Sequence, residues 1–546
     1  MTHEVTNQAP PRVDVDEYTL NAPLVEAVRA FGAEWADATL RDAGGLVGSG
    51  EFQADAERAN THEPVLRTHD RWGRRLDEVE YDPAYHRVIR EAVARGAHTS
   101  AWLEPMPGSS VARSAMFMLF AQVEPGHACP VSMSHAAIAS LHEAPALAAE
   151  WLPRLYSRDY DPRLLPAAEK PSALFGMAMT EKQGGSDVRA STTSGEHIGG
   201  DEYAITGHKW FCSAPMSDAF LVLAQTRRAG GDEGLSCLLV PRVLPDGTRN
   251  AFRIQRLKDK LGNRSNASSE VEFDGTVGSL VGEAGRGIRT IIEMVQRTRL
   301  DCVLGTAAGM RQSVAEAVWH ARERSAFGRR LVEQPAMTAV LADLALEYEA
   351  SLLTGLRLAQ LFEADASDHD IALRRLATPV AKYWVCKRGP HHAYEALECL
   401  GGNGYTEAFP LARRYREQPV MAVWEGSGNV IALDVLRALT REPDVAEAFA
   451  EELATTRGAS RVLDAHVERT LGLLRSLAGT DTDSAQAQAR RLAGDLALAF
   501  QGSLMLSHAP HSDAEAFVAA RLGDDRGAQY GVLPTGTDAT AIVARH

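Results

Sequence analysis

The chain has 546 residues, of which 45% are hydrophobic and 24% charged, as in an ordinary globular protein. A chain of this length is too long to fold around a single hydrophobic core, so about three or four structural units are expected. The net charge of −15 argues against broad nucleic-acid binding. No apolar run reaches the roughly 18 residues of a membrane span, and residues 1–20 do not resemble a secretory signal. A cytoplasmic protein without membrane contact is expected.

The six cysteines are scattered, with no CxxC pair and no cluster of cysteine and histidine. We therefore expect neither a metal site nor a disulfide framework. The cysteines are predicted to be free thiols that mostly fill the core.

From about residue 24 to 166 the pattern is helical, with segments such as 83–97 and 111–123 separated by prolines. Another helix is predicted to begin near Ser132, a plausible N-cap. Residues 1–15 are predicted to form a loose arm, which a neighbouring subunit could order.

Between about residues 174 and 287 the pattern changes to short apolar or alternating runs, at 220–225, 236–240 and 269–273. Glycine, proline and Asp-Gly turns separate these runs. The region is predicted to be a small barrel of antiparallel strands.

Long helical stretches return at about 288–325, 335–364 and 371–400, which predicts a bundle. The fold class is therefore mainly α with a central antiparallel β-barrel domain and an extra C-terminal helical domain. The predicted domains are 1–173 (helical), 174–287 (β), 288–440 (bundle) and 441–546 (helical, becoming loop-like after Gly523).

Two stretches of the β region have the composition of ligand-binding loops. Thr180, the Gly184–Gly185 pair and Ser186 would let the backbone approach a ligand, although such turns are mostly just turns. Further on, Phe211 and Ser213 end a predicted strand. Aromatic residues there usually belong to the core, but a flat cofactor ring would use the same arrangement.

Two helix ends in the bundle are also candidates. Residues 322–329 cluster guanidinium groups near Arg324 and Phe327, which could clamp a pyrophosphate or simply favour a helix C-terminus. Gly401 and Gly402 follow another helix, where a plain helix stop is the alternative.

The sequence around Glu425 places one carboxylate between Trp424 and a Gly/Ser turn, ahead of a predicted helix at 430–436. The indole can raise the pKa of the carboxyl group by desolvation, which suits a general base. The helix entrance, with Ser427 and Asn429, can hold an anionic or carbonyl group. An ordinary capping acid is the alternative.

Together, in this order and spacing, these stretches resemble the FAD-dependent acyl-CoA dehydrogenases over about residues 80–440. The matching segments are 180–187, 211–213, 258–265, 324–328, 401–405 and 424–427. Within that family, the length and the helical tail look most like the AidB branch, which is linked to the adaptive response to DNA alkylation.

The resemblance implies that FAD lies between the β region and the bundle of a homotetramer. Thr180, Gly184, Gly185 and Ser186 would contact its isoalloxazine or phosphates, while Phe211 would pack on the ring and Ser213 would bond near N5. The pyrophosphate and adenosine of a neighbouring subunit's FAD would be held by Arg324, Phe327, Gly401 and Gly402, with Ser427 and Asn429 completing the cradle.

The same resemblance implies α,β-dehydrogenation of a short or branched acyl-CoA or related thioester. Glu425 would remove the α-proton, flavin N5 would accept the hydride, and an electron-transfer flavoprotein would reoxidise the cofactor. Some relatives carry the base where Thr298 stands here, and threonine cannot serve. Arg299 would orient or charge-balance Glu425, or be merely structural.

Two other functions stay open. An AidB-like protein could bind FAD and DNA with incidental dehydrogenase activity, but residues 441–546 are lysine-free and net acidic, which disfavours DNA. A flavin oxidase acting on a nitroalkane is the other alternative. Relatives with that chemistry carry aspartate at the base position, so Glu425 argues against it.

Overall fold

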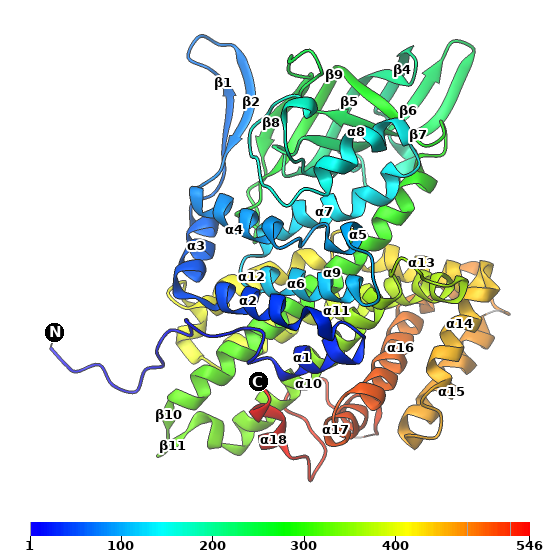
Figure 1. Cartoon of the computed structure of the whole chain (residues 1–546). Helices are drawn as coiled ribbons and strands as arrows, with labels where there is room; N and C mark the ends of the chain where they lie inside the picture. Colours follow the sequence, from blue (N-terminus) through cyan, green and yellow to red (C-terminus); the bar gives the residue numbers. More distant parts are fainter. Residues whose placement is uncertain (1, 478, 525) are drawn as a thin grey trace. The chain divides into compact units, whose positions relative to one another are not determined.

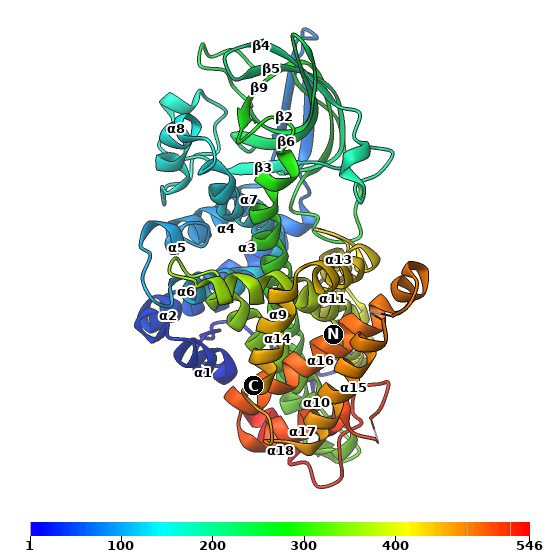
Figure 2. The same cartoon turned by 90° about the vertical axis from the view of Figure 1, so that its right-hand side faces the viewer.

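A computed structural model describes residues 2–477, 479–524 and 526–546 (Figures 1 and 2). The chain divides into two compact units, each built from several stretches of sequence. The first unit comprises Met1–Gly50, Pro105–Val123 and Arg299–His546, and the second comprises Glu51–Glu104 and Glu124–Thr298. The four domains expected from the sequence remain a prediction.

The second unit contains a seven-stranded sheet. Its strands are β3 (Phe175–Ala178), β4 (Ser194–Gly199), β5 (Glu202–Ser213), β6 (Ala219–Arg228), β7 (Gly231–Pro241), β8 (Phe252–Leu257) and β9 (Ser268–Val281). The order is β3-β6-β4-β5-β9-β7, with β8 beside β9 and a further pairing of β6 with β7.

The sheet is mixed, so the prediction of purely antiparallel strands is wrong for two pairings. Strands β3 and β4 both run parallel to β6, whereas the other pairs are antiparallel. Parallel neighbours need a long connection. The β4–β5 hairpin and the segments that flank it provide one between β3 and β6.

The strands pack through side chains that are fully buried. One cluster includes Tyr203, Phe220, Val222, Leu238 and Phe252, and another joins the opposite side of the sheet to helix α7 through Met133, Phe175 and Leu221. Burying a large aliphatic or aromatic side chain contributes about 1.5–3 kcal/mol. These clusters fix the strands that carry the predicted ligand loops.

The α-helices of the second unit precede the sheet, except for the first part of α9 (Gly287–Glu323), which follows it. The preceding helices are α3 (Gly50–Thr61), α4 (Pro83–Ala94), α5 (Ser100–Leu103), α7 (Pro125–Leu141) and α8 (Pro145–Leu155). A hairpin of β1 (Val65–His69) and β2 (Arg75–Glu80), which the helical pattern did not predict, separates α3 from α4.

Helix α7 does not begin at Ser132 as predicted. It begins at Pro125, where the side chain of Glu124 accepts hydrogen bonds from the N–H groups of Gly126 (3.1 Å) and His127 (2.7 Å). Proline in the first turn loses no helical hydrogen bond, and the buried carboxylate satisfies two N–H groups. Ser132 therefore lies inside the helix.

The first unit is helical. It contains α1 (Ala22–Ala30), α2 (Asp37–Gly48), α6 (Ser109–Ala121), part of α9 (Gly287–Glu323), α10 (Pro335–Gln360), α11 (Asp368–Glu398), α12 (Pro410–Met421) and α13 (Gly428–Arg441). The three long helices predicted from periodicity are confirmed within a few residues as α9, α10 and α11.

The C-terminal segment belongs to the same unit. It forms α14 (Pro443–Ala454), α15 (Arg461–Leu477), α16 (Thr482–His508), α17 (His511–Leu522) and α18 (Ala539–Ala544), drawn in orange to red in Figure 1. Helix α16 packs on α10, α11 and α13, so this segment extends the bundle.

The described part of the N-terminal arm is fixed by its own chain. The carbonyl of Pro10 accepts a hydrogen bond from Trp319 Nε1 (2.8 Å), and the Asn7 side chain donates to the carbonyl of Ser325 (2.8 Å). Arg12 forms a buried ion pair with Glu17. The expectation of a loose arm is therefore wrong for these residues.

All six cysteines are free, and all except the half-buried Cys129 are buried, as predicted. In the part of the chain that the structure describes, no helix combines the length and apolar composition needed to cross a bilayer.

Candidate active site

Glu425 lies in the connection between α12 and α13, in a backbone conformation that side chains rarely adopt. Its φ angle is +57°, and that of Gly426 is +109°. The left-handed conformation costs a residue with a Cβ about 1–2 kcal/mol, so neighbouring groups must hold it. Gly426 cannot be replaced easily either, because a Cβ there would lie 2.8 Å from Ile431 Cδ1.

Two cationic side chains hold this turn by its main-chain oxygens. Arg299 Nε, from α9, donates to the carbonyl of Glu425 at 3.2 Å. Lys382 Nζ, from α11, donates to the next carbonyl, that of Gly426, at 2.5 Å. Both side chains are buried. Charge-assisted bonds to consecutive carbonyls keep Glu425 in its left-handed conformation.

The charge of Arg299 is balanced within the same unit. Its Nη1 contacts Asp434 Oδ2 of α13 at 2.7 Å, and Arg375 contacts the other oxygen at 3.2 Å. Burial alone would raise the pKa of Asp434, but the two guanidinium groups outweigh it and lower the pKa. Arg299 thus has its counter-ion in Asp434 and reaches Glu425 through the main chain.

The surroundings of Glu425 are apolar on one side. Trp424 packs against a buried cluster of Cys302, Cys386 and Met421, and Glu425 itself is half-buried. Desolvation of the carboxylate by the indole, and with it the role of Glu425 as a base, stays a prediction.

The N-terminus of α13, next to this turn, faces two cations. Ser427 is the N-cap but its side chain makes no capping bond. A Cβ on Gly428 would lie 2.4 Å from Lys387 Cε and 3.8 Å from Arg490 Nη2. Among the described residues, neither cation forms an ion pair with a carboxylate. Free helix N–H groups beside two such cations form an anion-binding arrangement.

Lys387 and Arg490 were not found from the sequence. Burial lowers the pKa of Lys387 most, and the charges of Arg490 and Lys382 lower it further. Arg490 comes from α16, in the C-terminal segment, and no local pattern marks it. Asn429, predicted from the sequence, is exposed in the first turn of α13.

Arg324 and Phe327 lie at the end of α9. Arg324 Nη1 donates to the carbonyl of Asn7 at 2.5 Å. The short strands β10 (Ser325–Ala326) and β11 (Arg329–Arg330) are joined by Phe327 and Gly328, both with positive φ, as a two-residue hairpin requires. The Phe327 side chain is 99% exposed, so nothing in its own subunit covers it.

Gly401 and Gly402 follow α11 at the start of the short helix η5 (Gly401–Tyr405). Gly401 has a φ of +58°, the conformation that commonly ends a helix. No atom lies within 4 Å of a Cβ built on either glycine, and Tyr405 is 84% exposed. Both predicted contacts are therefore on open surface.

In the second unit, the loop that carries Thr180 is anchored by a buried ion pair. Glu181 contacts Lys209 Nζ of β5 at 3.0 Å and accepts hydrogen bonds from the N–H groups of Thr192 and Thr193. Burial alone would raise the pKa of Glu181, but these donors lower it well below its usual range. The sequence pattern of this loop does not reveal the pair, because Glu181 and Lys209 are 28 residues apart.

Close packing explains one glycine of this loop. A Cβ on Gly185 would lie 2.4 Å from Thr180 Oγ1, so the site requires glycine. The carbonyl of Thr180 accepts a hydrogen bond from Trp210 N (2.8 Å), which ties the loop to β5. Gly184 and Ser186 are exposed beside it.

A β-bulge in β5 turns two aromatic rings outward. The pairs with β9 on either side of the bulge are Lys209–Val271 and Cys212–Ser269. Trp210 and Phe211 therefore both stand opposite the single residue Glu270, and neither points into the core. Phe211 is 45% exposed, which excludes the alternative that it is a core residue. Two residues on, the Ser213 hydroxyl lies 3.3 Å from that of Ser268.

Comparison with known proteins identifies the family. Three family models match: the adaptive response protein AidB N-terminal domain at residues 7–162, the acyl-CoA dehydrogenase middle domain at 176–276, and its C-terminal domain at 285–440. AidB of Escherichia coli is 44% identical over 96% of this chain and 95% of its own length. The chain belongs to the acyl-CoA dehydrogenase family.

Solved structures of acyl-CoA dehydrogenases agree with this assignment. The crystal structure of Caenorhabditis elegans ACDH-11 in complex with C11-CoA has a TM-score of 0.86 and 26% identity, and the match covers 98% of this chain and 96% of that one. An acyl-CoA dehydrogenase from Bacillus anthracis complexed with FAD shares the fold, with a TM-score of 0.66 and 16% identity over 95% and 85% of the two chains. As a family member, this chain is an FAD-dependent oxidoreductase that acts on acyl-CoA, and FAD is its expected cofactor.

Lys209→Met should lower the stability of this acyl-CoA dehydrogenase by about 3 kcal/mol, because it leaves the Glu181 carboxylate buried without its cation. Adding Glu181→Gln, which keeps an acceptor for the Thr192 and Thr193 N–H groups, should restore about 2 kcal/mol of that loss. Urea unfolding measures both. A double variant no more stable than Lys209→Met would contradict the assignment of the pair.

Asp434→Asn should lower the free energy of unfolding by about 2 kcal/mol at pH 7, because it removes the charge that balances Arg299 and Arg375. The native pKa of Asp434 lies below its ordinary value of 3.8, so the stabilisation is present above that value and is lost as the pH falls through the native pKa. Unfolding at pH 7 and at about pH 3 should therefore show a smaller difference between variant and wild type in acid. A constant difference would mean that the carboxylate charge is not involved.

Proposed function

We propose that this chain forms the α,β double bond of a short or branched acyl-CoA thioester, with Glu425 as the base. The observation that carries the proposal is the Glu425 turn, in which Arg299 and Lys382 hold a half-buried carboxylate in a strained conformation. Backbone strain of this kind is concentrated at functional sites. Family membership supplies the reaction class.

The residues present fit FAD. In the first unit, the α13 N-terminus offers helix N–H groups beside Lys387 and Arg490, two cations without a carboxylate partner among the described residues, and this is the donor set that a pyrophosphate needs. In the second unit, Phe211 offers an exposed ring for the isoalloxazine, with Ser213 beside it. When bound, FAD supplies the acceptor for a hydride.

Glu425 performs the proton transfer. Its carboxylate takes the proton from the carbon next to the thioester carbonyl, and the electron pair of that C–H bond becomes the new double bond as a hydride leaves the β-carbon. Arg299 and Lys382 fix the direction of the carboxylate, because they bind the two main-chain carbonyls that follow its Cα. The two cations are positioning residues.

The acyl group is proposed to be short or branched. Trp424, packed on the Cys302–Cys386 cluster beside the base, is a bulky neighbour that narrows the space for a chain. The bound C11-CoA of the worm protein supports a thioester of coenzyme A as the substrate class.

A homotetramer and a flavoprotein electron acceptor complete the proposal. Phe327 and Tyr405 are large, almost fully exposed rings, and an interface with a second copy of the chain would remove them from water. If a second copy covers these rings, Arg324 and the Gly401–Gly402 turn of this chain would lie next to the FAD of that second copy.

The DNA-protective role is disfavoured. Helices α14–α17 come from the acidic, lysine-free segment, and two of its arginines are used internally. Arg521 pairs with Asp343 and Glu347, and Arg545 pairs with Glu349 and Asp513. The net negative charge of this segment and the internal use of these two arginines favour dehydrogenation over DNA binding.

Glu425→Gln should retain FAD but reduce the rate of anaerobic flavin bleaching by butyryl-CoA or isovaleryl-CoA about 10³-fold, because the amide cannot accept the α-proton. Stopped-flow absorbance measures the rate. Glu447→Gln, an exposed change on α14, is the control and should bleach like wild type. Bleaching of Glu425→Gln at the wild-type rate would refute the base assignment.

Arg490→Ala should weaken FAD binding about tenfold, since a charged hydrogen bond to phosphate contributes roughly 1.5–3 kcal/mol. Titration of the apoprotein with FAD, followed by flavin fluorescence, measures the affinity. Arg491→Ala removes the adjacent, exposed arginine and should leave the affinity unchanged. Equal effects of the two substitutions would show that Arg490 has no specific role.

A further inference from the structure

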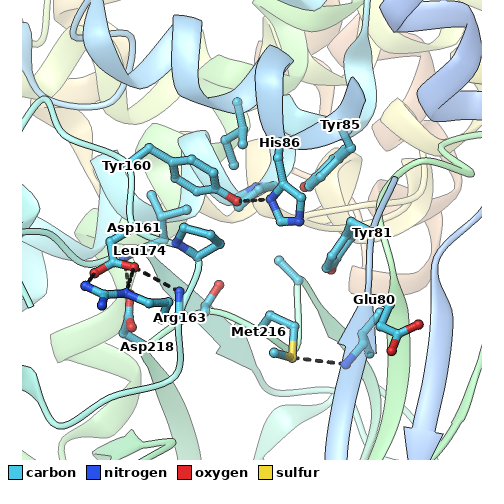
Figure 3. Close-up of a pocket in the computed structure, with 16 residues that line it drawn as sticks. Glu80, Tyr81, Tyr85, His86, Tyr160, Asp161, Arg163, Leu174, Met216 and Asp218 are labelled. Atoms are coloured by element: carbon cyan, nitrogen blue, oxygen red, sulfur yellow. Dashed lines mark hydrogen bonds and ion pairs between the residues drawn. The ribbon is translucent and has the colours of Figure 1, made fainter. Parts of the chain in front are cut away.

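A separate cavity of about 320 Å³ lies wholly within the second unit (Figure 3). Helix α4, the end of β2, the loop around Tyr160 and the β5–β6 loop line it. None of the residues of the Glu425 turn or of the predicted FAD contacts is among its lining. The volume is about twice the roughly 150 Å³ of an apolar cavity that accommodates benzene.

Aromatic rings with fixed orientations form one side of this cavity. The rings of Tyr81 and Tyr85 are stacked, with centroids 4.5 Å apart and planes at 14°. The imidazole of His86 stands edge-on to both rings. Its Nδ1 forms a hydrogen bond of 2.8 Å with the hydroxyl of Tyr160, and the dashed line between these two side chains in Figure 3 marks it. Such a rigid aromatic wall favours a flat ring as ligand.

Apolar side chains form much of the remaining wall. Met216, Ile89, Val79 and Leu174 line the cavity, and the Met216 sulfur is fixed by a hydrogen bond from Val79 N (3.2 Å). Contact with these groups stabilises a ligand that has little polar surface.

The acidic side chains and Arg163 that line the cavity are each neutralised by a partner. Asp161 pairs with Arg163 (2.7 Å), and Asp218 pairs with the buried Lys170 (2.5 Å). At the opposite side, Glu80 pairs with Arg67 (3.0 Å). A charged ligand would have to break one of these pairs or remain without a counter-ion, which is unfavourable.

Two uncharged polar groups remain available to a ligand. The buried Ser217 hydroxyl has no hydrogen-bond partner among the described residues, and a buried hydroxyl without a partner is unfavourable. Burial and the nearby Arg90 lower the pKa of His86, which keeps the imidazole neutral at pH 7. A ligand with one donor or acceptor would match these groups.

We propose that this cavity is a second ligand site, which binds an uncharged aromatic compound of one or two fused rings carrying a hydrogen-bonding group. Tyr81, Tyr85 and His86 contact the ring of the compound, and Ser217 bonds its polar group. The site is independent of the dehydrogenase reaction proposed above.

Indole is the probe, used with the purified, flavin-loaded protein in isothermal titration calorimetry. Wild type should bind indole at one site per chain and bind indole-3-acetate at least tenfold more weakly, because the carboxylate has no free cation in the cavity. Met216→Trp should fill the cavity and abolish indole binding, whereas Met106→Trp, a matched change at an exposed methionine outside the lining, should leave it unchanged.

Ser217→Ala tests the polar contact without filling the cavity. It should reduce the affinity for indole about tenfold and leave the thermal unfolding midpoint at or above that of wild type. The proposal is overturned if wild type does not bind indole, if Met216→Trp binds it as wild type does, or if indole-3-acetate binds equally well.

Discussion

Two cationic side chains that bind consecutive carbonyl oxygens are the constraint on which the proposed chemistry depends. Without Arg299 and Lys382, the left-handed conformation of Glu425 would be unfavourable, and the chain between α12 and α13 would relax toward the right-handed region. The direction of the carboxylate is therefore set by α9 and α11, which lie far from it in the sequence. The rigid bundle is what makes a short connecting turn precise enough to place a base.

Charge pairing of buried side chains recurs in both units of the molecule. Several buried cations are paired with carboxylates, as in Lys209–Glu181, Lys170–Asp218 and Arg299–Asp434. Removing one partner would leave a buried ion alone, which is strongly destabilising. The half-buried Lys387 and the exposed Arg490 have no carboxylate partner among the described residues, and they meet at a helix N-terminus, where an anion would stabilise both.

The C-terminal segment packs on the helical bundle and contributes a side chain to the surroundings of α13. Helix α16 packs against three helices of the bundle and brings Arg490 next to the start of α13. The family model of the C-terminal dehydrogenase domain ends at residue 440, before this helix begins. In this branch of the family, the extension thus adds a cation beside residues that the dehydrogenase domain already supplies.

The sequence by itself determined the long helices and the position of the β region, and it predicted the motif residues around Thr180, Phe211, Arg324 and Glu425. These features follow from local periodicity and from short motifs, which can be recognised within a few residues. The tertiary structure alone decided the parallel pairing of β3 and β4 with β6 and the start of α7 at Pro125. It also decided which side chains surround the Glu425 turn and the N-terminus of α13. Lys382, Lys387, Arg490 and Asp434 are spread over about a hundred residues, and the reason they act together is packing between helices, which a local pattern does not encode.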